Sequence, residues 1–75
     1  MARLPVVSGK ETIRAFEKLG WLVHRRESSH VGMHRHGRSE LLTIPNHTEV
    51  AKGTLRALIR QANITVKEFI EALRK

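Results

Sequence analysis

The sequence predicts an α+β domain in which a three-stranded antiparallel sheet carries its helices on one face. Two observations lead to this prediction. Apolar residues recur at helical spacing before residue 20, alternate with polar residues from residue 21, and return to helical spacing after residue 53. Capping boxes, in which Ser or Thr stands three positions before Glu, precede the first and last helical segments. The expected order is helix, three strands, helix and short helix, which leaves the other face of the sheet open.

The first helix is expected to begin after Ser8 and to run to about Leu19. The side chains of Ser8 and Glu11 can each accept a hydrogen bond from the other residue's backbone N–H, which satisfies donors left free at a helix start. Gly20 is a natural stop for this helix. Its predicted buried stripe consists of Ile13, Phe16 and Leu19.

Two short strands joined by a polar turn at residues 27–29 are expected between Trp21 and His36. Strict alternation divides their side chains between the two faces of the sheet. The residues expected to face the helix are Trp21, Val23, Val31 and Met33. Those expected on the open face are Leu22, His24, Arg26, His30, Gly32 and His34. Residues 40–44 are expected to form the third strand, which Pro45 ends because proline cannot donate to a ladder.

Two further helices are expected after the polar loop at residues 46–53. Residues 54–62 carry one apolar face, and Thr65 to Glu68 is the second capping box, which opens the short last helix. The apolar residues of these helices are Leu55, Leu58, Ile59, Ala62, Val66, Phe69, Ile70 and Leu73.

Length and composition limit the classes of function that this chain can have. Residues 1–75 are enough for one domain with a modest core, and a net charge of +7 favours a polyanionic partner, although a merely basic domain is the alternative. The chain has no cysteine, which excludes disulfides and thiolate metal sites and suits the cytoplasm. No stretch resembles a signal peptide or approaches the length of a membrane span, so we expect neither export nor membrane insertion. Aromatic residues are too few for a base-stacking platform.

Several segments, in this order along the chain, point to a known family. They are Leu4–Glu11, Gly20-Trp21, Arg25 with Ser29-His30, Ile44–His47, Lys52–Arg56, and Ala62–Thr65 ahead of Glu68-Phe69. Together they resemble the HicA (YcfA-like) toxins, the mRNA interferase halves of HicA–HicB toxin–antitoxin pairs. The resemblance implies a fold like that of double-stranded-RNA-binding domains, ribonuclease activity on mRNA, and neutralisation by a HicB-type antitoxin. Binding of DNA is expected only indirectly, through the antitoxin.

The family's catalytic histidine lies in a Gly-Ser-His motif, which falls here on Ser28-Ser29-His30. Ser28 departs from that motif. The family glycine can be needed because the backbone has a positive φ there or because the RNA backbone approaches closely. In either case Ser28 is expected to reduce activity without moving the histidine. The resemblance thus implies that His30 is the catalytic residue.

The chemistry of RNA cleavage suits such a site. RNA supplies its own nucleophile, the 2′-hydroxyl, so the enzyme needs a proton acceptor, a proton donor and positive charge near the phosphate. Imidazole has an ordinary pKa of about 6.5 and serves in either proton role near neutral pH. We therefore expect an endoribonuclease without a metal or other cofactor, with His30 as general base or acid. The expected phosphate-binding residues are Arg25, Arg26, Ser29, Arg35, Lys52 and Arg56.

Several alternatives remain open on the sequence alone. The candidates for the second proton carrier are His24, His34 and His47, although all three can also be ordinary surface residues. The alternative interpretation of His30 itself is an ordinary solvated histidine on a strand. A metal site at His30, His34 and His36 is disfavoured, because Glu27 is the one nearby carboxylate and Asp is absent. The ridge formed by Lys52, Arg56 and Arg60 either tracks phosphates, docks an acidic antitoxin surface or is merely solvated. The alternative function is a non-catalytic RNA-binding module of the same fold.

Overall fold

The structure is a computed structural model that describes residues 3–75. Its elements follow the predicted order, so the α+β prediction is confirmed. They are α1 (Gly9–Lys18), β1 (Leu22–Arg26), β2 (His30–His34), β3 (Leu42–Pro45), α2 (Lys52–Gln61) and α3 (Val66–Arg74). The last helix, predicted to be short, has 9 residues and is almost as long as α2, which has 10.

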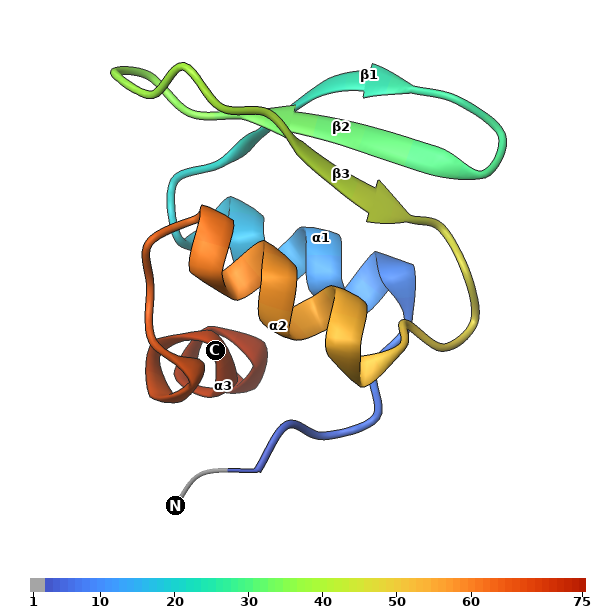
Figure 1. Cartoon of the computed structure of the whole chain (residues 1–75), viewed down its shortest axis with the longest axis vertical. Helices are drawn as coiled ribbons and strands as arrows, with labels where there is room; N and C mark the ends of the chain where they lie inside the picture. The colour runs from blue at the N-terminus through green and yellow to red at the C-terminus, as the bar shows by residue number, and fades with distance from the viewer. Residues whose placement is uncertain (1–2) are drawn as a thin grey trace.

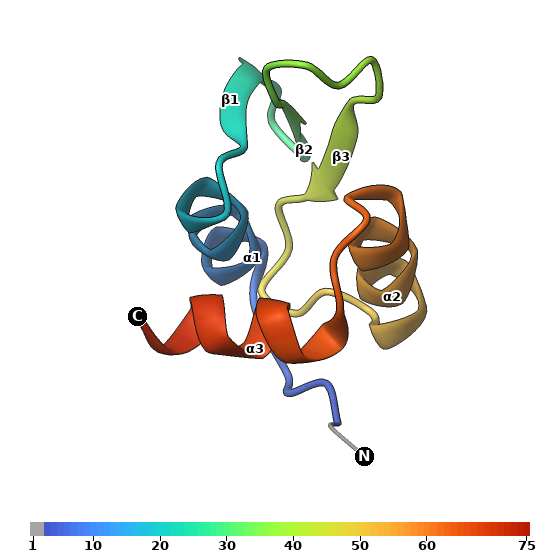
Figure 2. The same cartoon turned by 90° about the vertical axis from the view of Figure 1, so that its left-hand side faces the viewer.

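The sheet has the strand order β1-β2-β3, and both neighbouring pairs are antiparallel. Helices α1 and α2 lie side by side against one face of it, and α3 crosses below them on the side away from the sheet (Figures 1 and 2). No helix covers the opposite face of the sheet in either view. The sheet therefore has the open face that the sequence predicts.

Both capping boxes form as predicted. The Ser8 hydroxyl accepts from the backbone N–H of Glu11, and the Glu11 carboxylate accepts from that of Ser8. Thr65 and Glu68 make the same reciprocal pair at the start of α3. Gly20 ends α1 with a φ of 100°, a left-handed conformation that a side chain would strain.

The core forms between the sheet and the helices, and Trp21 and Phe16 lie in it as predicted, each 0% exposed. Arg38, in the connection between β2 and β3, packs against the core. Its guanidinium lies over the indole of Trp21, 5.8 Å from the ring centroid, and donates to the carbonyl oxygens of Gln61 and Ala62 at the end of α2. Arg38 also pairs with Glu40 and lowers the pKa of that carboxyl. With these residues held in the connection, β3 begins at Leu42, two residues later than predicted.

The alternation predicted for β1 is wrong beyond Val23, because the strand contains a bulge. Val23 pairs with Met33 as strict alternation requires, but the register then shifts, so that Arg25 pairs with Gly32 and Arg26 with Val31. One extra residue in β1 moves each later side chain to the opposite face. Arg26 therefore shares the face of buried Val31, and Arg25 takes the place on the open face that was predicted for Arg26.

Candidate active site

His30 is the first residue of β2 and lies on the open face of the sheet. Val31 and Met33, its alternating neighbours, are 1% and 0% exposed and point into the core. Because side chains alternate along a strand, His30 faces away from the helices, and it is exposed. A large substrate can therefore reach the imidazole without entering a cavity.

The Ser29 hydroxyl holds one side of that imidazole. Its Oγ lies 3.0 Å from His30 Nδ1, within hydrogen-bond distance. Since a hydroxyl can donate or accept, this contact suits both the neutral ring and the imidazolium. Nδ1 is thus engaged within the protein, which leaves Nε2 as the ring nitrogen open to a ligand.

Backbone hydrogen bonds hold the turn that carries Ser29 and His30. The Glu27 N–H donates to the His30 carbonyl and closes the turn at 2.9 Å. The Asn46 N–H donates to the Ser29 carbonyl at 2.9 Å, and the Gly9 N–H donates to the His47 carbonyl at 2.8 Å. The start of α1, the loop after β3 and the β1–β2 turn at residues 27–29 therefore form one connected frame.

Gly9 allows this frame to close. A Cβ placed on Gly9 would lie 2.4 Å from the Pro45 carbonyl oxygen and 2.9 Å from the Cα of Asn46, both backbone atoms. Alanine at this position is expected to push the loop after β3 away from α1. We expect Gly9→Ala to lower the free energy of unfolding by about 1–3 kcal/mol, measured by urea denaturation.

Gly53→Ala is the matched control for that measurement. Gly53 lies in the first turn of α2, and a Cβ there would meet nothing within 4 Å. Alanine in such a helical position is expected to be neutral or to stabilise by up to about 1 kcal/mol. Equal stability changes in the two variants would contradict the close contact at Gly9.

The predicted arginines occupy three different positions. Arg25 pairs with Gly32 and is therefore a diagonal neighbour of His30 on the same face, within reach of a long side chain. Arg26 lies on the other face. Arg35 follows the far end of β2, roughly 16 Å from His30 along the strand at about 3.3 Å per residue. Its guanidinium lies beside Gly20. Of the three, the structure brings Arg25 to His30.

The other imidazoles do not gather at His30. His24, in the bulge, lies against His34, with ring centroids 5.3 Å apart. This pair sits toward the end of β2 away from the β1–β2 turn. His47 belongs to the frame that holds the β1–β2 turn. Its contact there is made by the backbone carbonyl, which accepts a hydrogen bond from the Gly9 N–H, and not by the imidazole. Between residues 3 and 75, no three metal-ligating side chains come together as a possible metal site.

Ser28 has an ordinary backbone conformation. Asn63 is the one non-glycine residue with a positive φ in the described chain. The β1–β2 turn thus needs no glycine at position 28 for its conformation, which removes one of the two reasons for which Ser28 is expected to reduce activity.

Lys52 and Arg56 are exposed on the first two turns of α2. The start of α2 and the β1–β2 turn both lie toward the right-hand side of Figure 1. Ala51, the N-cap, makes no side-chain hydrogen bond to the helix, so the first backbone N–H groups of α2 have no side-chain cap. The sequence pattern places the start of this helix near residue 54 and therefore does not predict an uncapped start at Lys52. The Val50-Ala51 pair could have indicated it, because neither side chain can cap a helix.

Comparison with known proteins gives one finding. The family model described as "HicA toxin of bacterial toxin-antitoxin" matches residues 9–64, which include every element from α1 to α2. No curated protein and no solved structure matches the chain. None of the helices in residues 3–75 has the length and apolar character required to span a membrane.

Proposed function

The chain belongs to the HicA toxin family of bacterial toxin–antitoxin systems, and from this premise we propose that it is an endoribonuclease that cleaves mRNA and so blocks translation. One observation carries the proposal beyond family membership. His30 is exposed on the uncovered sheet face, and Ser29 engages its Nδ1, which leaves Nε2 for the substrate.

The proposed reaction is an internal displacement at phosphorus. The His30 Nε2 accepts the proton of the RNA 2′-hydroxyl, whose oxygen bonds to the adjacent phosphorus as the bond from phosphorus to the 5′-oxygen breaks. The leaving oxygen takes a proton from solvent or from a second group. The products are a 2′,3′-cyclic phosphate and a 5′-hydroxyl. In this proposal Arg25 stabilises the charge that develops on the phosphate oxygens, and its position diagonal to His30 supports that role.

The requirement for the 2′-hydroxyl tests this reaction. We expect the purified protein in EDTA to cleave a long unstructured RNA and to leave the DNA strand of the same sequence intact. The RNA fragments should end in cyclic phosphates, detected by mass spectrometry. Cleavage of the DNA strand would contradict the mechanism. Binding of RNA without cleavage would instead support the alternative, a non-catalytic RNA-binding module.

We propose that the start of α2 binds RNA phosphates, as the expected double-stranded-RNA-binding-domain-like fold implies. Exposed Lys52 and Arg56 and the uncapped N–H groups of α2 favour an anion there. The double variant Lys52→Glu/Arg56→Glu is expected to weaken RNA binding at least tenfold, measured by gel shift at fixed salt, while antitoxin affinity is unchanged. The reverse pattern would assign this ridge to the antitoxin.

We further propose that a HicB-type antitoxin neutralises the toxin in the cytoplasm by covering the open face around His30. The net charge of +7 suits an acidic surface on that partner. In this proposal, contact with DNA is made by the antitoxin.

A further inference from the structure

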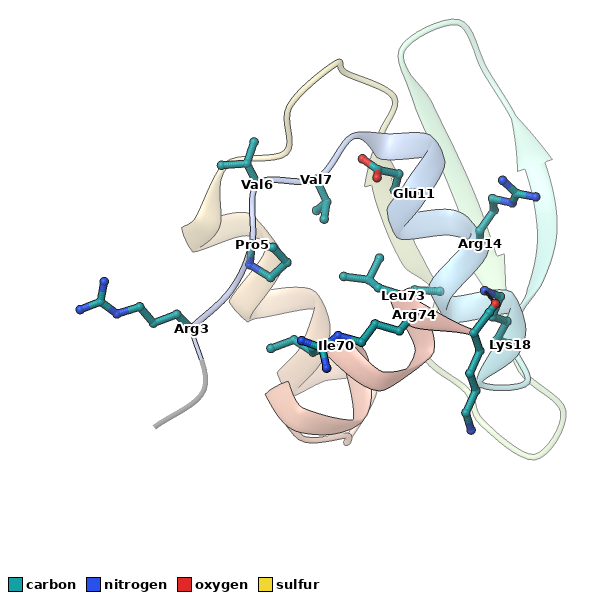
Figure 3. A pocket seen from close by; sticks show the side chains of 12 residues that line it. Arg3, Pro5, Val6, Val7, Glu11, Arg14, Lys18, Ile70, Leu73 and Arg74 are labelled. Atoms are coloured by element: carbon teal, nitrogen blue, oxygen red, sulfur yellow. Dashed lines mark hydrogen bonds between the residues drawn. The ribbon is translucent and has the colours of Figure 1, made fainter.

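A groove lies on the helical side of the molecule, apart from the sheet. It has a volume of about 780 Å³ and is formed by the segment before α1, by α1 itself and by α3. Figure 3 shows Val7, Ile70 and Leu73 toward its middle, with Arg3 and Arg14 on opposite sides. No residue of the sheet or of the β1–β2 turn lines it. The ribonuclease proposed above makes no use of this groove.

The floor of the groove is apolar and incompletely covered. Val6 is 65% exposed, the highest value among the large exposed apolar side chains of the described residues. Ile70 and Leu73 are only half-buried, although each belongs to the apolar stripe of α3. These side chains would lose further contact with water if a second apolar surface covered them.

The rim of the groove is basic. The cationic side chains that line it are those of Arg3, Arg14, Lys18, Arg74 and Lys75. Glu11 is the one acidic side chain lining the described groove, and its carboxylate already accepts the backbone N–H of Ser8. Lys18 is likewise engaged, because its Nζ donates to the backbone oxygen of Lys75, so Arg3, Arg14 and Arg74 carry most of the rim's charge. The groove therefore presents an excess of positive charge around an apolar floor.

We propose that this groove docks an acidic amphipathic segment of a partner protein. Apolar side chains of that segment cover Val6, Ile70 and Leu73, and its carboxylates face the basic rim. The volume lies within the range of about 300–1,000 Å³ typical of pockets that hold a ligand, enough for a few side chains.

The other classes of occupant fit less well. A second copy of this chain carries the same charge of +7 and would be repelled. RNA could offer phosphates to the basic rim, but it carries no aliphatic side chains to cover Val6, Ile70 and Leu73. A lipid surface is broad and flat, whereas this site is concave.

Because the groove and His30 lie on different sides of the sheet, the docked segment leaves the catalytic face free. The proposal is thus independent of the ribonuclease activity. It adds a second contact surface to the one expected for the antitoxin.

The test uses the whole chain labelled with ¹⁵N and a fluorescent peptide of about 16 residues, with Leu at i, i+3, i+4 and i+7 and Glu elsewhere. A peptide of the same composition, reordered to remove the apolar face, is its control. Val6→Glu and Arg14→Glu alter the floor and the rim at exposed positions. Leu41→Glu, at a residue 54% exposed outside the groove, and Lys10→Glu, at an exposed residue of α1 outside it, are the matched controls.

We expect the amphipathic peptide to shift NMR resonances of groove residues and to bind at least tenfold more tightly than the reordered peptide. Each groove variant should lower its affinity at least tenfold, and each control variant by less than about twofold. Equal losses in groove and control variants would reduce the effect to general charge attraction and overturn the proposal. So would binding of RNA or phosphatidylglycerol vesicles at the groove without binding of the amphipathic peptide.

Discussion

Phe16→Ala is expected to lower the free energy of unfolding by about 3–5 kcal/mol. Phe16 is 0% exposed and joins two helices to the sheet side of the core. Its ring centroid lies 6.4 Å from that of Trp21, edge to face, and 5.5 Å from that of Phe69 on α3. Alanine leaves a cavity among these rings, and the loss is a large share of the stability of a chain this small, since proteins gain only about 0.05–0.15 kcal/mol per residue.

Urea denaturation followed by circular dichroism measures this loss, with Phe16→Leu as the control. Leucine keeps most of the apolar volume, so that variant is expected to lose less than about 2 kcal/mol. A Phe16→Ala variant within about 1 kcal/mol of the parent would show that the three rings do not carry the core.

His30→Ala is expected to abolish the growth arrest that the parent chain causes when it is induced in bacteria without an antitoxin. In the proposed mechanism this imidazole moves the proton of the attacking hydroxyl, a contribution of about 10²–10⁴ in rate. Because His30 is exposed, its removal should leave the fold unchanged. The measurement is the growth curve after induction, with equal protein levels confirmed by immunoblot.

His34→Ala is the matched control for that experiment. His34 lies on the same strand as His30, but it contacts His24 at the end of β2 away from the β1–β2 turn. Cells that make His34→Ala should stop growing as the parent does. Arrest by His30→Ala, or its loss in both variants to the same degree, would remove the special role of His30.

Local patterns were sufficient to predict most of the fold. The capping boxes at Ser8 and Thr65, the break at Gly20 and the burial of Trp21 each depend on residues a few positions apart, and all of them occur as predicted. The bulge in β1 does not depend on such a pattern. It arises from pairing between β1 and β2, and alternation alone therefore misplaced Arg26.

The candidate site shows the same division. The exposure of His30 followed from alternation with Val31 and Met33. Arg35 lies far from His30 in space, although the two residues are close in sequence, because the extended strand β2 runs from one to the other. The tie from Gly9 to the loop after β3 joins residues nearly 40 positions apart, and no local pattern indicates it. The basic groove likewise forms from segments at opposite ends of the chain.

The measurement that tests the central claim most directly is incubation of the purified protein with a long unstructured RNA in EDTA, beside folded His30→Ala. We predict fragments with the parent and intact RNA with the variant, a difference in initial rate of at least about 10²-fold. Intact RNA in both samples, with binding still seen by gel shift, would contradict the claim of catalysis. Equal cleavage in both samples would contradict the assignment of that catalysis to His30.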